Sequence, residues 1–413
     1  MARRFDAVIV GAGPAGSAAA ILLARAGWNV ALVERQRFPR RKVCGECIAA
    51  TNLPLLDALG VGDAVRVLAG AELRRVALWR GDRSVAAALP AADDGVHRFG
   101  RALGREHLDT LLVERARCAG ATVLQPYALH RFEGEPGRFT FQLRSAGEGG
   151  ETIDLQAAVA IAAHGSWEPL PSERESRRAA RKRSDLFAFK ANFRGVRLDA
   201  DLLPVLSFPG GYGGMVIADA GQATLACCVR EDALERERSR PGERRAGDAV
   251  EAMLRRECGG VAESLRDARR EGPWLSTGPI RPGVRLGVGD GVFRIGNAAG
   301  EAHPIIGEGI SMALQSAFLL ASMLGAQREA LAGASALPAH ARLLGEYEAL
   351  WRASFAPRLR IAAMFAHAAM RPAVAASLWP LVLRWPGVLA RGARWSGKTR
   401  CLAQASRLAE ASR

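Results

Sequence analysis

Three glycines near the start of the chain are spaced as Gly11-x-Gly13-x-x-Gly16, directly after an apolar segment. Gly11 allows a tight turn, Gly13 lets the backbone approach a ligand, and Gly16 lets a following helix pack on the preceding strand. Pro14 and Ala15 suit the start of that helix, where free N–H groups and the helix dipole favour an anion. These residues predict a binding site for the pyrophosphate of a dinucleotide.

The elements around this turn read as a strand–helix–strand unit. Residues 5–10 predict a buried parallel strand, residues 14–26 a helix, and residues 30–33 a second strand. Glu34 closes the second strand 18 residues after Gly16, where a carboxylate accepts hydrogen bonds from a ribose diol. The alternative is a glycine-rich turn in an unrelated α/β fold. The order of strand, glycines, helix, strand and acid favours the dinucleotide site.

A second glycine-rich turn, Gly296-Asn297-Ala-Ala-Gly300, follows a buried strand predicted over residues 292–295. Beyond it, a long apolar helix is expected from about Ile310 to Leu324, opened by Pro304 and the run Gly307-Glu308-Gly309. The N-terminus of this helix would stabilise negative charge that collects on a flavin when the flavin is reduced. The alternative is a purely structural turn, which is less favoured because two such turns flank one domain.

A basic loop separates these motifs and contains Cys44-Gly45-Glu46-Cys47. A zinc site would need two further ligands, and the sequence has no second CxxC or HxxxH pair. A thioredoxin-type redox disulfide would need a different context. The pattern therefore favours two thiols that line a cofactor loop, and no metal site is expected.

The remaining pattern predicts an α/β protein in which a second sheet interrupts the nucleotide-binding domain. A hairpin over 72–90, strands over 186–193 and 223–229, and a glycine-rich turn over 208–215 predict an inserted antiparallel sheet. We expect residues 1–71, 100–167 and 275–330 to bind the nucleotide. Residues 72–99 and 168–274 would form the substrate domain, and residues 331–413 a helical C-terminal region.

Composition and charge restrict the function classes. Of the 413 residues 49% are hydrophobic, yet no uninterrupted apolar run of about 18 residues predicts a membrane-spanning helix. The absence of a signal-peptide pattern and seven unevenly spaced cysteines lead us to expect reduced thiols and a cytoplasmic protein. The formal charge of +15 is clustered at 174–183 and after Arg384. Aromatic residues do not interleave with these clusters, so nucleic acid is not an expected partner.

A solvated arginine-rich surface is the favoured explanation of the charge, with an anionic membrane face or a phosphorylated substrate left open. The aromatic residues of the C-terminal helices are expected to cap the core, with a membrane-surface contact as the minority alternative. These residues are Trp351, Phe355, Phe365, Trp379 and Trp385.

Taken together, the motifs resemble the FAD-dependent oxidoreductases that include aromatic-ring hydroxylases, geranylgeranyl reductases and flavin-dependent halogenases. Four segments carry the resemblance, which extends to about residue 330: the first glycine turn with Glu34-Arg35, the loop Lys42-Val-Cys44-Gly45-Glu46, the helix start Arg105-x-x-x-Asp109, and Gly296 to Gly309. The resemblance implies a Rossmann-like FAD-binding domain of the glutathione-reductase-like, group A flavin monooxygenase type. It also implies an inserted antiparallel-sheet substrate domain and a helical C-terminus.

The resemblance further implies roles for individual residues. Glu34, next to Arg35, would bind the adenosine ribose, Arg105 would lie along the FAD, and Asn297 would sit near the ribityl–pyrophosphate region. Cofactor contacts are also implied for Cys44, Gly45, Pro304, Glu308 and Ile310, with the turn from Gly307 to Gly309 beside the isoalloxazine ring. Two positions depart from the family: Asn297 stands where Asp is usual, and His164-Gly165 replaces an Asp-Gly pair that helps with NAD(P)H.

Several reactions compete within the family. Halogenases carry Trp-x-Trp-x-Ile-Pro in the middle domain, and the corresponding segment around Tyr212 and Met215 lacks it. The favoured expectation is a monooxygenase in which NAD(P)H transiently reduces FAD, oxygen adds to the flavin C4a, and the hydroperoxide hydroxylates a hydrophobic or aromatic, polyketide-like molecule. Tyr212, Met215 and Phe189 are expected pocket residues, although core packing would explain them equally well.

Two alternatives remain open. The first is reduction of alkenes, as in geranylgeranyl-reductase-like sequences, where a cysteine on the equivalent loop can face the substrate; Cys44 is then a candidate catalytic residue. The second is a flavoprotein that contacts a membrane surface or a carrier protein. A separate reductase is a further expected partner if no nicotinamide binds.

Overall fold

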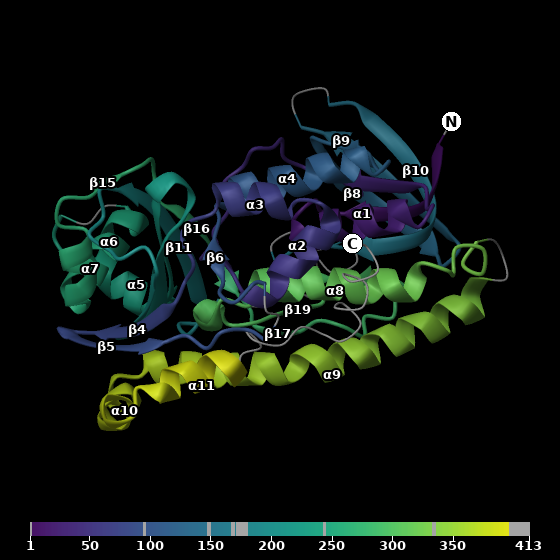
Figure 1. The fold of residues 1–413 in the computed structure, drawn as a ribbon. Coiled ribbons are helices and arrows are strands. Elements are labelled where there is room, and N and C mark those ends of the chain that lie inside the picture. Colours follow the sequence, from purple (N-terminus) through teal and green to yellow (C-terminus); the bar gives the residue numbers. More distant parts are fainter. Residues whose placement is uncertain are drawn as a thin grey trace.

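The computed structural model describes residues 2–93, 96–146, 150–166, 170, 181–242, 245–332 and 336–395. Two large β-sheets occupy opposite ends of the molecule, and a long C-terminal helix runs along one side (Figure 1). Most of the basic cluster at 174–183 and the chain beyond residue 395 lie outside the described residues.

The first sheet contains the predicted dinucleotide unit. Its central strands β7, β2, β1, β10 and β18 are parallel, and β9 and β8 continue it in antiparallel fashion. In sheet order the strands are β7 (Thr122–Leu124), β2 (Val30–Val33), β1 (Arg3–Val10), β10 (Thr152–Ala162), β9 (Arg138–Ser145) and β8 (Tyr127–Glu135), with β18 (Phe293–Arg294) beside β10. The first part of β10, residues 152–157, pairs with β9.

Helices bury their apolar faces against this sheet and against one another. α1 (Pro14–Arg25) packs between α4 (Arg105–Cys118) and α8 (Gly309–Leu324). Fully buried side chains from all three helices, such as Ile21, Leu112 and Phe318, share one hydrophobic core. This packing holds the glycine turn before α1 and the N-terminus of α8 in fixed positions.

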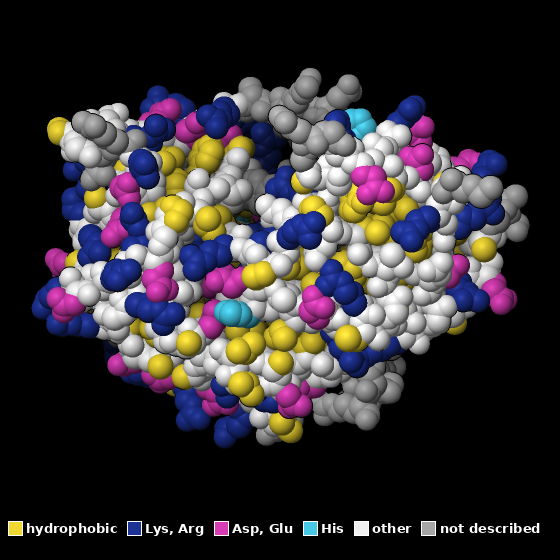
Figure 2. Space-filling view, turned by 90° about the horizontal axis from the view of Figure 1, so that it is seen from above, with side chains coloured by type: hydrophobic (Ala, Val, Ile, Leu, Met, Phe, Trp, Pro, Cys, Tyr) yellow, Lys and Arg dark blue, Asp and Glu magenta, His cyan; other side chains and the backbone are white. Residues whose placement is uncertain are grey.

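Shorter elements complete this half of the molecule. The helices α2 (Leu53–Leu59) and α3 (Gly62–Leu68) follow the cysteine loop, and Gly60 ends α2 in the left-handed conformation. Seen from above, the surface over this half mixes basic and acidic side chains (Figure 2). The remaining short strands and 3₁₀ turns are β3 (Cys47–Ile48), β6 (Arg101–Ala102), β17 (Gly283–Val284), β19 (Gly300–Glu301), η1 (Ala50–Asn52), η3 (Asp219–Gly221), η4 (Gly296–Ala298) and η5 (Pro304–Ile306).

The second sheet is mixed rather than purely antiparallel, because β12 and β4 run parallel. In sheet order its strands are β15 (Arg269–Arg270), β11 (Leu186–Arg194), β14 (Ala223–Arg230), β13 (Gly211–Ile217), β12 (Leu202–Phe208), β4 (Arg75–Arg80) and β5 (Arg83–Ala88). β16 (Leu275–Ile280) pairs with β11, so these residues join the second sheet although the prediction placed them in the nucleotide-binding domain. One face is covered by α5 (Glu231–Arg238), α6 (Ala246–Glu257) and α7 (Gly259–Ser264).

The glycine-rich turn predicted over 208–215 is mostly wrong, since β13 begins at Gly211. These glycines serve close packing within the sheet. A Cβ atom added at Gly213 would lie 2.7 Å from the carbonyl oxygen of Ala226 on β14, and one at Gly211 would lie 2.1 Å from the ring of Phe208. In the sequence, a glycine required where two strands approach closely cannot be distinguished from a glycine required in a turn.

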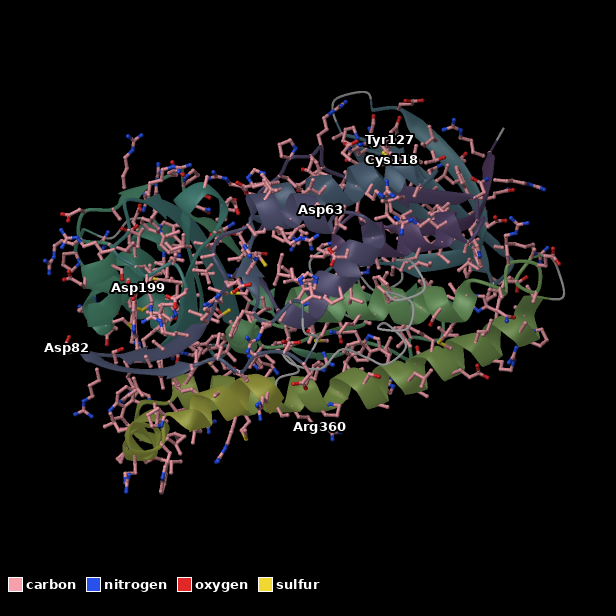
Figure 3. The ribbon with its side chains drawn as sticks, viewed as in Figure 1. Asp63, Asp82, Cys118, Tyr127, Asp199 and Arg360 are labelled. Carbon is pink, nitrogen blue, oxygen red and sulfur yellow. The ribbon has the colours of Figure 1, made fainter. Side chains whose placement is uncertain are left out.

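The C-terminal region is helical, as predicted. It consists of α9 (Ala336–Met370), α10 (Pro372–Arg384) and α11 (Gly387–Trp395). The expected core cap is confirmed for the buried Trp351, Phe355 and Trp379 but wrong for Trp385, which lies exposed just after α10. Figure 3 places Arg360 on the side of α9 that faces away from the two sheets.

The described helices include none that alone is long and apolar enough to cross a bilayer. Together α9 and α10 meet that length and composition test, but the pair is bent by 103°.

Candidate functional site

A cavity of about 1120 Å³ connects the two sheets and the C-terminal helices. One end lies at the carboxyl ends of β1 and β2, where the first glycine turn begins. The middle is bordered by the second sheet, and the far end by α9, α10 and α11. Ligands of open parallel sheets bind at this edge, outside the carboxyl ends of the strands.

The cavity brings together most of the residues that the sequence singled out. Segments distant in the chain meet there, with predicted cofactor residues Gly11, Gly13, Pro14, Ala15, Glu34, Arg35, Cys44, Gly45, Arg105, Asn297, Pro304, Gly307, Gly309 and Ile310 on its wall.

Two predicted cofactor residues do not line the cavity. Gly16 packs behind the turn, where an added Cβ atom would lie 1.8 Å from the carbonyl oxygen of Gly11. Its role is the close helix–strand packing also expected from the spacing. Glu308 is fully buried, and its carboxylate lies 3.6 Å from the guanidinium of Arg358 on α9. A direct side-chain contact from Glu308 to a cofactor is therefore not supported, because this side chain joins α8 to α9.

The first glycine turn has the geometry of a phosphate cradle. Gly11 has φ of +107°, and a Cβ atom there would lie 2.5 Å from the carbonyl oxygen of Ala163. Gly13 precedes α1, and no side-chain hydrogen bond caps that helix end. The backbone N–H of Ala12 donates to Glu34 at 3.1 Å, which places the carboxylate beside the turn. These residues fit a bound dinucleotide, with α1 facing its phosphates.

Charged side chains surround this end of the cavity. Arg105 forms two hydrogen bonds of 2.7 Å with Asp109, and one terminal nitrogen of Arg105 lies 3.6 Å from the Cβ position at Gly13. Burial alone would lower the pKa of Arg105, but Asp109 and the neighbouring Cys44 raise it, so the guanidinium stays charged. Arg40 lies between Asp109 and Glu34, at 3.3 and 3.4 Å. The sequence did not single out Arg40; its only signal was the basic loop.

A second network supports the Asn297 turn. The amide of Asn297 donates to the hydroxyl of Ser166 at 2.9 Å, and that hydroxyl donates to Glu301 at 2.6 Å. Arg285 pairs with Glu301 at 2.6 Å and donates to the backbone carbonyl of Asn297. The Asn297 amide is thus held by its neighbours. Sequence reasoning missed Ser166, which is 131 residues from Asn297, and also the nearer Arg285 and Glu301, because none of the three belongs to a motif.

The cysteine loop lies between the cofactor end and the second sheet. Cys44 and Cys47 are both free thiols on the cavity wall. The backbone N–H of Glu46 donates to the sulfur of Cys44 at 3.3 Å.

Glu46 connects the two halves of the molecule. Its fully buried carboxylate pairs with Lys190 on β11 and accepts hydrogen bonds from Thr224 on β14 and from the backbone N–H of Arg105 on α4. The sequence analysis assigned no function to Lys190 or Thr224. A lysine in the alternating strand around Phe189 was the only available signal.

The part of the cavity bordered by the second sheet, here called the substrate end, is lined mainly by apolar side chains. Tyr212 lines the cavity, and a 3.1 Å hydrogen bond joins its hydroxyl to Nδ1 of His303. Burial and then the neighbouring His367 lower the pKa of His303 to about 4, so the imidazole is neutral at pH 7. Burial and then Cys228 raise the pKa of Tyr212 well above its usual value, so the phenol keeps its proton.

The other two predicted pocket residues lie differently. Met215 is absent from the cavity wall because side chains alternate along β13, and it packs with α6 on the opposite face. Phe189 borders the cavity, but it belongs to the same hydrophobic cluster as Met215. The pocket role is therefore wrong for Met215, and Phe189 serves mainly as core.

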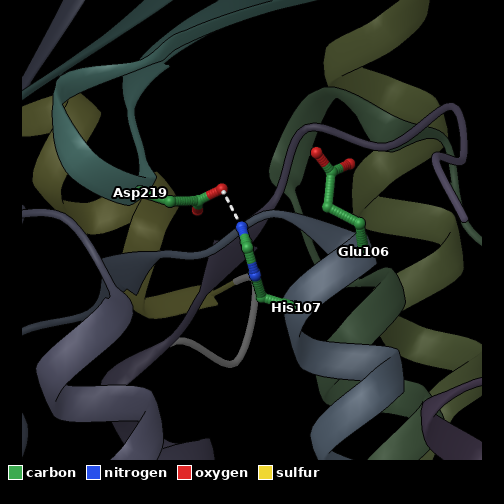
Figure 4. A group of neighbouring side chains, drawn as sticks. All are labelled: Glu106, His107 and Asp219. Carbon is green, nitrogen blue, oxygen red and sulfur yellow. Dashed lines mark ion pairs between the residues drawn. The ribbon is translucent and has the colours of Figure 1, made fainter. Parts of the chain in front are cut away.

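One group of ligating side chains lies at the start of α4 and consists of Glu106, His107 and Asp219 (Figure 4). Each already has a structural partner. Asp219 accepts a hydrogen bond from the backbone N–H of Gly104 at the helix start and pairs with His107 at 3.4 Å. Glu106 lies 3.4 Å from Arg41. The group carries no metal assignment.

A family model described as an FAD binding domain matches residues 4–344, so the chain belongs to this family of FAD-binding proteins. The residues at the glycine turns fit this cofactor. This confirms the family resemblance and the α/β fold expected from the motifs.

Named relatives within the family differ in their reactions. The chain is 26% identical over 330 residues to a tryptophan 2-halogenase of Chondromyces crocatus, covering 76% of this chain and 60% of the relative. It is 27% identical over 317 residues to digeranylgeranylglycerophospholipid reductase 2 of Methanopyrus kandleri, covering 75% and 74%. The myxobacterial chondrochloren halogenase CndH shares the fold, with a TM-score of 0.75, 18% identity and coverage of 99% and 97%. The chain spans less than two thirds of the tryptophan halogenase.

Proposed function

We propose that this protein is an FAD-dependent monooxygenase that uses NAD(P)H to hydroxylate a hydrophobic or aromatic small molecule. The observation that carries the proposal is the buried apolar cluster that borders the cavity beside the turn that precedes α8. There Ala188, Ile280 and Met370, from β11, β16 and α9, form one buried cluster with Tyr212. A flavin that reacts with oxygen needs such a site, because water would otherwise divert the activated oxygen.

The chain's own residues would bind and orient the cofactor. The turn at Gly11 and Gly13 would hold the pyrophosphate with the charge of Arg105, and Glu34 would accept hydrogen bonds from the adenosine ribose. The N-terminus of α8 would face the flavin ring and favour its reduced, anionic form. Bound FAD supplies the electron storage and the reaction with oxygen. Transient NAD(P)H is the proposed electron source.

Two relatives are halogenases, but the chain lacks the Trp-x-Trp-x-Ile-Pro motif, so halogenation is not the proposal. One observation favours a second candidate, the reduction of alkenes. Cys44 lies on the cavity wall between the cofactor end and Tyr212, in a loop similar to that of geranylgeranyl-reductase-like proteins.

The test is stopped-flow mixing of the FAD-loaded, fully reduced protein with oxygen. A monooxygenase gives a transient absorbance near ~380 nm, typical of oxygen activation by reduced flavin. Featureless reoxidation, repeated with a panel of aromatic and polyketide-like ligands, would contradict the monooxygenase. Consumption of an isoprenoid alkene under anaerobic conditions, lost in Cys44→Ala and kept in Cys118→Ala, would establish the reductase instead. Cys118 is the matched control because it is an exposed thiol at the end of α4, outside the cavity wall.

A further inference from the structure

The far end of the cavity opens at the C-terminal helices. Met364 on α9 and Leu378 and Leu381 on α10 line the cavity, yet these side chains are 57%, 42% and 41% exposed. A side chain that both lines a cavity and faces solvent marks its mouth. The rim of this mouth is therefore apolar, whereas the opposite end of the cavity is rimmed by charged groups.

The apolar rim continues outward along α10. Val374, Leu383 and Trp385 are exposed there. The guanidinium of Arg384 lies over the ring of Trp385, 6.0 Å from the ring centre. With the three mouth residues they make up six of the 13 exposed large hydrophobic side chains found among the described residues, all within residues 364–385. Such a concentration of exposed apolar surface marks a contact site.

The charge of the same region has one sign. From Ala349 to Trp395 the sequence has seven arginines and no aspartate or glutamate. Arg352 and Arg358 pair with acids outside this stretch. The other five are exposed, and none of them forms an ion pair with a described carboxylate: Arg360, Arg371, Arg384, Arg391 and Arg394. The opposite face of the molecule, by contrast, mixes both signs (Figure 2).

These features combine on one side of the molecule. The helices α9, α10 and α11 form its lower edge in Figure 1, and Arg360 extends from α9 away from the sheets in Figure 3. Exposed leucines and a tryptophan beside arginines, with no acidic residue, are the composition of a helix that lies in the interface of an anionic bilayer.

We propose that α10, α11 and the C-terminal half of α9 dock on the surface of an anionic phospholipid bilayer, with the cavity mouth facing the lipid. Leu383 and Trp385 would enter the headgroup region while the arginines contact lipid phosphates. A hydrophobic substrate would then pass from the bilayer into the cavity between Met364 and Leu381. Docking is independent of the reaction, whereas substrate entrance through this mouth rests on the proposed function.

The experiment is cosedimentation of the full-length, FAD-loaded protein with vesicles. Phosphatidylglycerol–phosphatidylcholine vesicles are compared with pure phosphatidylcholine, each at low and at high salt. The protein is expected to sediment with the anionic vesicles and to be released by salt, because exposed basic residues contribute through a screened field. Sedimentation does not require turnover. A protein that fails to bind vesicles can therefore be told apart from a protein that lacks the proposed activity.

Two double variants test the two parts of the surface. Arg384→Gln with Arg391→Gln should weaken binding to the anionic vesicles by roughly tenfold or more, since each basic residue near the lipid surface contributes to the electrostatic attraction. Leu383→Glu with Trp385→Glu should abolish it. The matched controls are Arg131→Gln with Arg138→Gln, which remove two exposed arginines on β8 and β9, and Val67→Glu at the 82% exposed valine of α3. The controls should bind as the unmodified protein does, and all variants should keep their FAD.

Three outcomes would overturn the proposal. The first is no sedimentation at low salt, and the second is equal loss of binding in the controls. The third is a stable dimer in light scattering that Leu383→Glu with Trp385→Glu converts to monomer, because a second copy would then cover this face.

Discussion

The two ends of the cavity differ in how their residues are held. At the cofactor end, Arg105 and Asp109 are four residues apart on one helix, and Glu34 closes the strand next to the glycine turn. At the substrate end, Tyr212 meets His303 across 91 residues, and between the two ends Glu46 meets Lys190 across 144. Local geometry builds the first end, and the docking of the second sheet on the first half builds the other.

This difference separates what each end does. The cofactor end has backbone N–H groups and paired charges, which suit a phosphate-containing ligand that many proteins bind in the same way. The substrate end has neutral polar groups among apolar side chains, which suit one hydrophobic molecule. Variants at the two ends should therefore have separable effects.

The largest effect is expected from Gly11→Ala. The new methyl group would need φ of +107° and would collide with the carbonyl oxygen of Ala163, so FAD binding should be lost. The measurement is the flavin absorbance of the purified protein with its urea unfolding midpoint. Gly27→Ala is the matched control, because Gly27 has φ of +83° and no neighbour within 4 Å of its Cβ position. It should lose roughly 1–2 kcal/mol and keep FAD; full FAD binding by Gly11→Ala would contradict the cradle.

Breaking the contact between the two ends comes next. Lys190→Met leaves the carboxylate of Glu46 buried without its cation, which should lower the free energy of unfolding by about 3–5 kcal/mol. The double variant Glu46→Gln with Lys190→Met removes both charges and should recover much of this loss. Urea unfolding of the single and double variants measures the coupling. Additive effects would show that the pair does not join the two halves.

Acid should destabilise the protein through two buried histidines. The pKa values of His303 and His340 are each lowered from 6.5 to about 4, mainly by burial. The unfolded chain therefore binds protons below pH 6.5 that the folded chain excludes until about pH 4. The free energy of unfolding should be highest above pH 6.5. It should fall as the pH drops from 6.5 towards 4, by roughly 1.4 kcal/mol per pH unit for each histidine.

His340→Phe distinguishes the two contributions. His340 lies behind the cofactor end, with its ring 4.9 Å from that of Phe293. Between pH 4 and 6.5, urea titrations of this variant should show a weaker dependence of the free energy of unfolding on pH. The contribution of His303 at the substrate end should remain. An unchanged slope would show that His340 already titrates normally in the folded state.

The smallest effect is expected from Tyr212→Phe. Loss of the hydrogen bond to His303 should cost about 1 kcal/mol of stability and change substrate turnover, with FAD content unchanged. Tyr347→Phe is the matched control, since its buried hydroxyl donates to the carbonyl of Arg294 in the other half. That variant should lose similar stability without a specific change in turnover. If turnover is the same in both variants, Tyr212 has no role in the substrate site.

The sequence by itself determined the motifs of the cofactor end. Its residues work through local geometry: the spacing of Gly11, Gly13 and Gly16, the acid at Glu34, and the helix start at Arg105 are all readable within short segments. The parallel strand unit and the C-terminal helices could be predicted for the same reason, because periodicity and glycine stops act over a few residues.

Only the tertiary structure decided the substrate end. Met215 and Tyr212 are three residues apart, but strand alternation and the docking of α6 place them on opposite faces. The partners of Glu46, the pairing of Tyr212 with His303, and the apolar mouth at α10 join segments far apart in the chain. Their contacts depend on how the second sheet and the C-terminal helices pack on the first half, and packing between distant segments leaves no fixed spacing in a sequence.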